Sequence, residues 1–321
     1  MPVTQTPLVS VVIPSYNHAP YVEATVASVL AQTYANLELF IIDDGSRDDS
    51  VARLKRMLDE RGDARAHLIA RENRGLCRTL NEGLRLARGH YFAYIGSDDL
   101  WEPEKLERQV AALAAAADER IGACYTDSYI IDAEGQRLDR FGRQYHYRGG
   151  DIYRDLLLMD YMPPSPTNLF GREKLLEVGG FNEDVRVEDY EAWLRVVRRF
   201  RVVYLPEVLA SFRVHRTNTS SNYPERMLES NCHGLKLAFE ADPSIPFWLR
   251  RHAIARQHAG VATVYYNALE MGRARREALR ALKLYPLEGR AWRIALGSLL
   301  GASLVERLRA RRRARLVYEN H

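Results

Sequence analysis

The amino-acid sequence predicts an α/β fold, in which a Rossmann-like, mostly parallel central sheet is flanked by helices and followed by a C-terminal helical extension. Three observations carry this prediction. Apolar runs typical of buried strands alternate with helical patterns in the first third of the chain. Each of these runs ends in polar or glycine-containing sequence. From about Met227 the chain changes to helical patterns with many arginines, and the 321 residues are 46% hydrophobic, enough for a sizeable core.

The first elements follow from the spacing of apolar residues. Continuous apolar runs without polar alternation predict strands that are buried on both faces. Helical patterns between them imply right-handed crossovers and a parallel sheet. The predicted order is strand 8–13, helix 22–30, strand 37–42, helix 50–60, strand 66–70, a helix around Leu80, and a strand from Tyr91.

The next part of the chain is less regular. Pro103 is expected at the first position of a helix, where its fixed φ suits the helical turn. Residues 122–127 predict another strand, and the polar, glycine-rich residues 132–151 favour a loop or a hairpin. Three prolines within 162–170 exclude a regular helix there.

Polar side chains follow the predicted strands, at the edge of the sheet where the carboxyl ends should meet. Asp43 and Asp44 follow the second strand, and Asp98 and Asp99 follow the fourth. Turn chemistry explains part of this pattern, since Asp, Asn, Gly and Ser are the usual turn formers. The convergence of several such segments favours a ligand cleft. For Asp98 and Asp99 alone, two interpretations stay open: a helix cap, or ligands of Mg²⁺ or Mn²⁺.

Charge is distributed unevenly along the chain. Residues 241–321 hold 16 Lys and Arg against 6 Asp and Glu, a net +10, and the whole chain has +4, so residues 1–240 carry −6. An acidic body argues against nucleic acid as a partner. Three widely spaced cysteines predict neither a disulfide framework nor a zinc site. The N-terminus lacks the positive start of a signal peptide and no apolar run is long enough to span a bilayer, so a cytoplasmic location is expected.

Five short motifs resemble, in order and spacing, those of family 2 glycosyltransferases with the GT-A fold. They are Pro14-Ser-Tyr-Asn17, Asp43-Asp-Gly-Ser46, Asn73-Arg-Gly75, Thr79-Leu-Asn81-Glu-Gly83 and Ser97-Asp-Asp99. The resemblance covers about residues 8–222. It implies an inverting, metal-dependent enzyme that moves a sugar from a nucleotide diphosphate-sugar, expected to be a UDP-sugar, to an acceptor hydroxyl. Synthesis of cell-surface polysaccharide or lipid-linked glycan is the implied role.

The resemblance also implies a division of the chain. Residues 1–225 would form the GT-A domain, with a nucleotide-binding half at about 1–101 and an acceptor half at about 102–225. Residues 226–321 would form the basic helical extension.

The family implies roles for residues in the matched motifs. Tyr16 would stack on the base and Asp44 would hydrogen-bond its edge. Asp98 would lie near the ribose, and Asp99 would bind the Mn²⁺ or Mg²⁺ that holds the diphosphate. The remaining residues expected at the nucleotide are Pro14, Asn17, Asn73 and Arg78, with Arg74 as an alternative to Arg78. One departure is Gly96, which stands where the family's fuller acidic motif has its first Asp.

A second chemical centre is expected further along the chain. Glu188 and Asp189 open a predicted helix, where acids are also favoured by the helix dipole alone. The resemblance assigns the catalytic base to this pair, and we place it on Asp189 with Glu188 beside it. His215 lies in a segment that resembles the family's Arg-x-His-x-x-Asn-x-Ser, and would complete the metal site or contact the diphosphate. His18 is expected to be an ordinary surface or core histidine.

The C-terminal extension ends in a run of arginines from Arg307 to Arg315. A basic amphipathic end can lie on an anionic bilayer, which would place the protein peripherally on the inner face of the cell membrane. The competing interpretation is a subunit contact in an oligomer. Two other functions stay open as alternatives: a nucleotidyltransferase, and a non-catalytic protein that binds nucleotide-sugars.

Overall fold

The computed structural model describes residues 6–116, 118–185, 188–216 and 224–307, with no description of the Glu188 side chain. The chain divides into two compact units. The first consists of Met1–Leu156 and Asp160–Asn218, and the second of Leu157–Met159 and Thr219–His321. No helix in the described ranges combines the length and apolar character needed to cross a bilayer.

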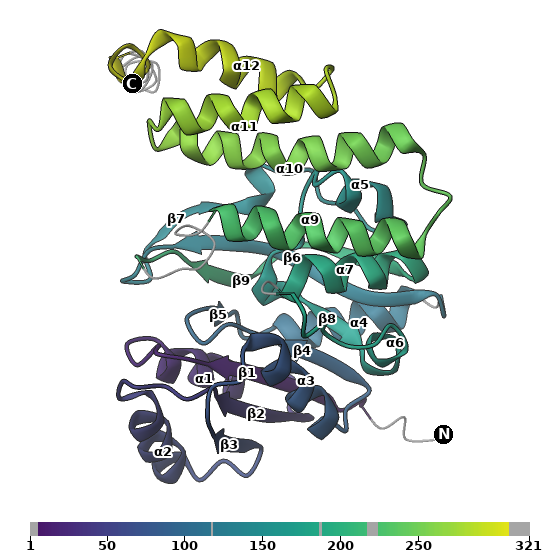
Figure 1. Cartoon of the computed structure of the whole chain (residues 1–321). Helices are drawn as coiled ribbons and strands as arrows, with labels where there is room; N and C mark the ends of the chain where they lie inside the picture. The colour runs from purple at the N-terminus through teal and green to yellow at the C-terminus, as the bar shows by residue number, and fades with distance from the viewer. Residues whose placement is uncertain (1–5, 117, 186–187, 217–223, 308–321) are drawn as a thin grey trace, which may run out of the picture. The chain divides into compact units, whose positions relative to one another are not determined.

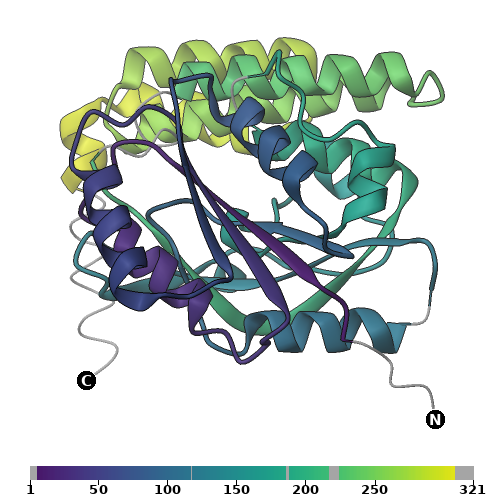
Figure 2. The same ribbon diagram turned by 90° about the horizontal axis from the view of Figure 1, so that it is seen from below.

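The first unit contains the predicted sheet (Figures 1 and 2). Its strand order is β3-β2-β1-β4-β8-β6-β9-β5, and β7 pairs with β6. The longest pairings, β1 with β2 and β6 with β9, are parallel, whereas β8, β5 and β7 run antiparallel to their neighbours. The strands are β1 (Val9–Ser15), β2 (Leu37–Asp43), β3 (Ala66–Ala70), β4 (Tyr91–Tyr94), β5 (Leu100–Trp101), β6 (Ile121–Ile131), β7 (Arg137–Arg140), β8 (Leu169–Gly171) and β9 (Arg201–Arg213).

Helices cover both faces because successive strand residues point to opposite sides. On one face, Val9, Val11 and Ile13 of β1 join a core that is closed by helices α1, α2 and α4. On the other face, Val12 lies against Gly83 of α3, where an added Cβ would come within 2.5 Å of the valine side chain. The helices of this unit are α1 (Val22–Leu30), α2 (Ser50–Arg61), α3 (Leu76–Leu86), α4 (Lys105–Ala116), α5 (Tyr153–Leu157), α6 (Arg172–Glu177) and α7 (Glu188–Arg199), with 3-10 turns at Phe141–Arg143 and Ser165–Thr167.

The second unit is built from antiparallel helices, α9 (Pro224–Ala241), α10 (Phe247–Asn267), α11 (Met271–Leu284) and α12 (Gly289–Gly297), followed by a 3-10 turn at Ser298–Leu300. Alanines dominate its core, which lets the helices approach closely. The predicted α/β fold with a mostly parallel sheet and a helical extension is confirmed.

Two local expectations differ from the structure. Helix α4 begins at Lys105, two residues after Pro103, because Trp101 still pairs with β9 and a turn occupies the residues between them. Strand β9 was not predicted at all, although at 13 residues it is the longest strand. Residues 132–151 contain the short hairpin of β6 and β7, one of the two forms expected for them. The arginines beyond Arg307 lie outside the described residues.

Candidate functional site

The loops that follow β1 and β2 are tied together at one edge of the sheet. Asn17 adopts a left-handed conformation (φ 54°). Its backbone N–H donates to Ser46 Oγ over 2.8 Å, and its side-chain Oδ1 accepts from Arg47 N over 2.8 Å. His18 N donates to Ser50 Oγ over 3.2 Å. These bonds fix the backbone that carries Tyr16 and His18.

Asp44 organises the loop that leads into α3. Its side chain is buried and pairs with Arg71. Its two oxygens also accept hydrogen bonds from Arg74 N over 2.8 Å and Gly75 N over 2.9 Å. Both oxygens of the Asp44 carboxylate therefore already accept hydrogen bonds from the protein itself. The contact between Asp44 and a nucleotide base stays a prediction.

A cluster of three side chains lies where β4 and β9 end. The Nε2 atom of His215 is 2.9 Å from Asp98 Oδ2, and the Nδ1 atom of His18 is 3.9 Å from Asp98 Oδ1. His18, Asp98 and His215 each offer a ligand atom, and these atoms all lie within 4.8 Å of one another. Two imidazoles and a carboxylate form a donor set suited to a divalent cation such as Mn²⁺.

The surroundings hold these donors in place. Ser97 Oγ lies 2.8 Å from His18 Nδ1, and burial lowers the pKa of His18, which favours the neutral imidazole that can bind a cation. The centre of the His215 ring lies 5.0 Å from that of the Tyr21 ring. The Arg213 guanidinium lies over the same Tyr21 ring, with its Cζ atom 4.9 Å from the ring centre. Arg213 Nε also donates to the backbone oxygen of Asp98 over 2.7 Å. The cluster is thus built from β1, β4 and β9 together.

Asp99 is placed differently from its neighbour Asp98. Its side chain is buried, with 3% exposure, and Oδ1 accepts a hydrogen bond from Arg213 N over 2.8 Å. Burial, and then the adjacent Asp98 carboxylate, raise the pKa of Asp99 well above its usual range. Asp99 therefore fastens β9 to the end of β4, and among the described residues it is not part of the three-residue donor cluster. Its role as a metal ligand stays a prediction.

Gly96 faces both carboxylates. A Cβ atom at this position would lie 2.8 Å from Asp98 Oδ1 and 3.2 Å from Asp99 Oδ2. A side chain at this position would therefore displace the Asp98 carboxylate from where it now lies, and glycine leaves room for it.

The other residues predicted at the nucleotide lie at the surface near these loops. Tyr16 is 45% exposed, which leaves it accessible to a planar group, and Pro14 is half-buried at the end of β1. Asn73 is exposed, and its backbone N would lie 2.7 Å from a Cβ added to Gly45. Arg78 pairs with Glu183 over 3.1 Å at the surface, so a phosphate would have to compete with that carboxylate.

Asn81 connects α3 to the loop before the predicted base. Its Nδ2 donates to Phe181 O over 2.8 Å, and its Oδ1 accepts from Phe181 N over 2.9 Å. Cys77 Sγ contacts Val185 O in the same loop at 3.4 Å. The motif around Asn81 thus positions the entry to α7, a purpose that its sequence did not indicate.

Asp189 lies in the first turn of α7, as predicted. Its side chain is half-buried, Oδ1 accepts a hydrogen bond from Tyr190 N over 2.7 Å, and burial raises the pKa of its carboxyl. A raised pKa makes an ionised carboxylate a better proton acceptor. Glu188 begins the same helix. No contact among the described residues joins Asp189 to the cluster of His18, Asp98 and His215.

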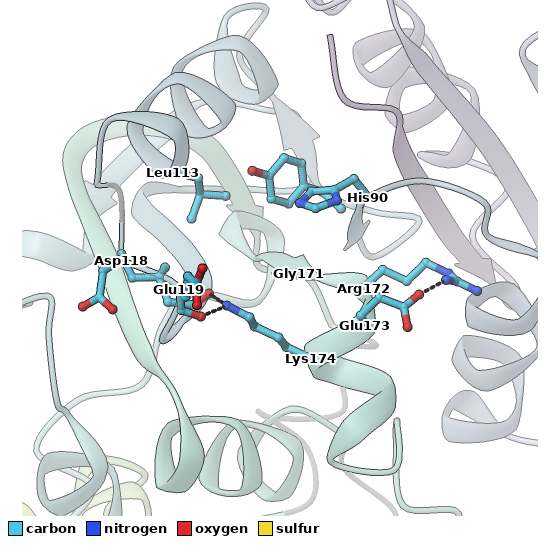
Figure 3. A pocket seen from close by; sticks show the side chains of 10 residues that line it. His90, Leu113, Asp118, Glu119, Gly171, Arg172, Glu173 and Lys174 are labelled. Atoms are coloured by element: carbon cyan, nitrogen blue, oxygen red, sulfur yellow. Dashed lines mark hydrogen bonds and ion pairs between the residues drawn. The ribbon is translucent and has the colours of Figure 1, made fainter. Parts of the chain in front are cut away.

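A hollow of about 290 Å³ lies elsewhere in this unit, at the opposite ends of β4 and β6 (Figure 3). Lys174 crosses it and donates to Ile121 O over 2.7 Å, while Arg172 pairs with the neighbouring Glu173. Acidic and basic groups are mixed on its walls, and none of the predicted site residues lines it. The residues that line it are His90, Tyr91, Leu113, Asp118, Glu119, Ile121, Gly171, Arg172, Glu173 and Lys174.

Sequence reasoning missed His18 as a member of the cluster. A single histidine in a loop after a strand has no periodic signature, and its partner His215 lies far along the chain. The signal that could have drawn attention to it is its position beside Tyr16 and Asn17, in the first motif at the predicted edge of the sheet.

Comparisons with known proteins agree with the motifs. The model of a family described as Glycosyl transferase family 2 matches residues 10–177. An uncharacterized glycosyltransferase of Haemophilus influenzae is 32% identical over 240 residues, covering 70% of this chain and 71% of that protein. The “Putative teichuronic acid biosynthesis glycosyltransferase TuaG” of Bacillus subtilis is 32% identical over 218 residues, covering 67% of this chain and 82% of that protein.

Solved structures are similar over most of the chain. The mannosyltransferase PcManGT from Pyrobaculum calidifontis, in complex with GDP-Man and Mn²⁺, has a TM-score of 0.58 at 22% identity and covers 94% of this chain and 87% of its own. S. aureus TarS in complex with UDP-GlcNAc has a TM-score of 0.55 at 16% identity and covers 87% of this chain and 89% of its own. At these identities the likeness shows the fold alone, and the GT-A-type architecture expected from the motifs is confirmed.

Proposed function

This chain belongs to glycosyltransferase family 2, and we propose that it moves a sugar from a nucleotide diphosphate-sugar to an acceptor hydroxyl, with inversion and with the help of a divalent cation. The observation that carries the proposal is the cluster of His18, Asp98 and His215, with the exposed Tyr16 two residues before His18 in the chain. In this arrangement, Tyr16 binds the base and the cluster lies where a diphosphate would follow.

Of the two ions expected, the donor set of two imidazoles and one carboxylate suits Mn²⁺ better than Mg²⁺, which prefers oxygen ligands. We propose that Asp98, with His18 and His215, holds the ion. Asp99 would position Asp98 indirectly, through its hydrogen bond to the backbone of Arg213 in β9. When bound, the ion supplies positive charge that offsets the charge of the leaving diphosphate. The solved relatives bind GDP-Man with Mn²⁺ and UDP-GlcNAc, which supports both a nucleotide-sugar donor and a cation.

The chain's own residues would perform the remaining steps. Asp189 accepts the proton of the acceptor hydroxyl as that oxygen attacks the anomeric carbon, in a single in-line displacement. Its raised pKa suits this role. The segments at 132–151 and 213–222 are candidates to cover the donor and exclude water, although 217–223 lie outside the described residues.

The acceptor is proposed to be a glycan or a lipid-linked glycan of a surface polysaccharide. The similarity to TuaG, whose name assigns it to teichuronic acid biosynthesis, supports this class. Family membership leaves the nucleotidyltransferase alternative without support. A protein that binds nucleotide-sugars without transferring them is the alternative that an assay must separate.

The test is release of nucleoside diphosphate from a panel of UDP-, GDP-, dTDP- and CDP-sugars, with and without Mn²⁺ and with lipid-linked glycan acceptors. We expect turnover with one nucleotide class, UDP first, and loss of turnover when the ion is chelated. Stabilisation of the fold by a nucleotide-sugar without release of its nucleotide would favour the non-catalytic alternative. Equal turnover with EDTA would contradict the proposed role of the cation.

A further inference from the structure

The outward face of α12 in the second unit is apolar where a solvated helix should be polar. The inward residues Ala291, Ile294 and Ala295 are buried, and Ile294 is the largest of them. The outward residues are larger and are exposed: Trp292, Leu296, Leu299 and Leu300. An amphipathic surface helix ordinarily shows the reverse arrangement.

These four side chains form one surface because of their spacing. Trp292, Leu296 and Leu299 are separated by four and three residues, so they lie on one side of the helix and of the 3-10 turn after it. Contiguous exposed apolar patches mark sites that bind proteins or membranes. We call these four residues the α12 face.

Arginines flank the α12 face and exposed acids are scarce there. Arg293 is exposed and Arg290 is half-exposed, whereas the exposed Glu306 and Arg307 that follow have opposite charges. The one acid between Leu287 and Val305 is Glu288, which is buried, caps α12 by accepting from Arg290 N over 3.2 Å, and contacts His252 Nε2 at 3.2 Å. The local charge on this surface is therefore positive.

We propose that the α12 face docks onto an anionic phospholipid bilayer and lies in the plane of its interface. Trp and Leu side chains would enter the boundary between headgroups and acyl chains, while arginine side chains extend to the lipid phosphates. A second copy of the chain fits less well, because a two-fold contact through this face would bring like charges together. The sequence continues with further arginines from Arg309 to Arg315, outside the described residues.

The test uses the full chain and flotation with vesicles of phosphatidylcholine, alone or mixed with phosphatidylglycerol. We expect binding to the anionic vesicles, weakened by salt, and at least tenfold weaker binding for the double variant Leu296→Asp with Leu299→Asp. Leu138→Asp is the matched control, because Leu138 and Leu296 are both 59% exposed and Leu138 belongs to β7 of the other unit. The control should bind as the wild type does.

A second variant separates charge from apolar contact. Arg293→Gln should weaken binding to anionic vesicles by roughly fivefold, since one basic residue at such a surface contributes about 1 kcal/mol, and should leave the thermal unfolding temperature unchanged.

Failure of the wild type to bind either vesicle would overturn the proposal. A wild-type dimer in sedimentation that Leu296→Asp dissociates, with no vesicle binding, would assign the face to a second copy instead. Equal loss in Leu138→Asp would also contradict it. None of these outcomes depends on sugar transfer.

Discussion

The two units depart from ordinary solvation in opposite ways. The sheet unit buries ionisable groups, including Asp44, Asp99 and most of the Asp98–His215 pair, which water would solvate better. The helical unit leaves large apolar side chains of α12 in water, which would be more stable in a core. Burying a charge and exposing a leucine both reduce stability relative to the reverse arrangement.

We infer from this difference which kind of ligand each unit suits. Buried acids and histidines at a strand end suit a charged ligand that replaces water, such as a cation with a diphosphate. Exposed Trp and Leu side chains between arginines suit a phospholipid bilayer, which has an apolar interior and anionic headgroups. In each unit, the unfavourable solvation points to the ligand that would relieve it.

The largest expected effect is the loss of turnover on substitution of Asp189. Asp189→Asn keeps the shape and removes the proton acceptor, so turnover should fall by about 10²–10⁴-fold while stabilisation by nucleoside diphosphate is retained. In the wild type, turnover should fall as the pH drops through the raised pKa of this carboxyl, above the usual range for Asp. Initial rates against pH measure both.

The matched control is Asp184→Asn, an exposed acid in the loop before α7 whose substitution should leave the rate unchanged. Wild-type turnover in Asp189→Asn would place the base elsewhere in the chain.

An effect of intermediate size is expected at Lys105, a buried basic residue in the sheet unit that is not part of the ligand cluster. Its Nζ donates to Gln109 Oε1 over 2.8 Å and lies 3.9 Å from the centre of the Trp101 ring, and the described residues provide no carboxylate partner. Burial lowers the pKa of Lys105 to about 7. The unfolded chain therefore binds more protons than the folded chain between about pH 7 and 10, and this group makes stability rise with pH across that window.

Lys105→Met should raise the free energy of unfolding by about 2 kcal/mol at pH 6, after allowance for the lost bond to Gln109, and by little or nothing at pH 10. Urea unfolding at the two pH values measures this difference. Stabilisation by nucleoside diphosphate should not change, because this buried charge serves no ligand. Equal destabilisation at both pH values would show that the folded protein depends on the packing or the hydrogen bond of this side chain and not on its ionisation, and would contradict the lowered pKa.

The smallest effect is expected on the stability of the helical unit. Leu296→Asp should change the free energy of unfolding by no more than about 0.5 kcal/mol, because the exposed side chain contributes little to the core. Chemical unfolding without lipid tests this. A loss of several kcal/mol would mean that the α12 face is covered within the protein, and the contrast between the two units would disappear.

Sequence patterns predicted the first strands and helices because those strands are continuous apolar runs that the sheet buries on both faces. Strand β9 escaped prediction because Arg201, Pro206 and Glu207 interrupt its apolar pattern, and its pairing with β6 shifts register. The arginines at the C-terminal end led us to expect contact with an anionic bilayer, but the sequence did not show which apolar side chains of α12 face outward, because the stretch 294–305 is uncharged throughout.

The site was predictable in part. The motifs after the strands indicated the edge of the sheet where the polar side chains gather. The segment around His215 resembles a family motif, and this resemblance predicted that His215 lies near the acids of the metal site. The different surroundings of Asp98 and Asp99 could not be predicted, because adjacent residues of one segment point in different directions and only the backbone decides which faces the histidines. The role of Asn81 depended on a loop a hundred residues away.

The most direct test of the central claim is thermal unfolding with UDP and with GDP, each with and without Mn²⁺, in the wild type, Asp98→Asn and Asp99→Asn. A ligand at about 100 times its Kd adds ~2.7 kcal/mol, a shift of several degrees. We predict that one nucleotide stabilises the wild type only with Mn²⁺, that Asp98→Asn abolishes this dependence, and that Asp99→Asn retains it. Retention of the Mn²⁺ dependence in Asp98→Asn, with its loss in Asp99→Asn, would contradict the account and return the ion to Asp99.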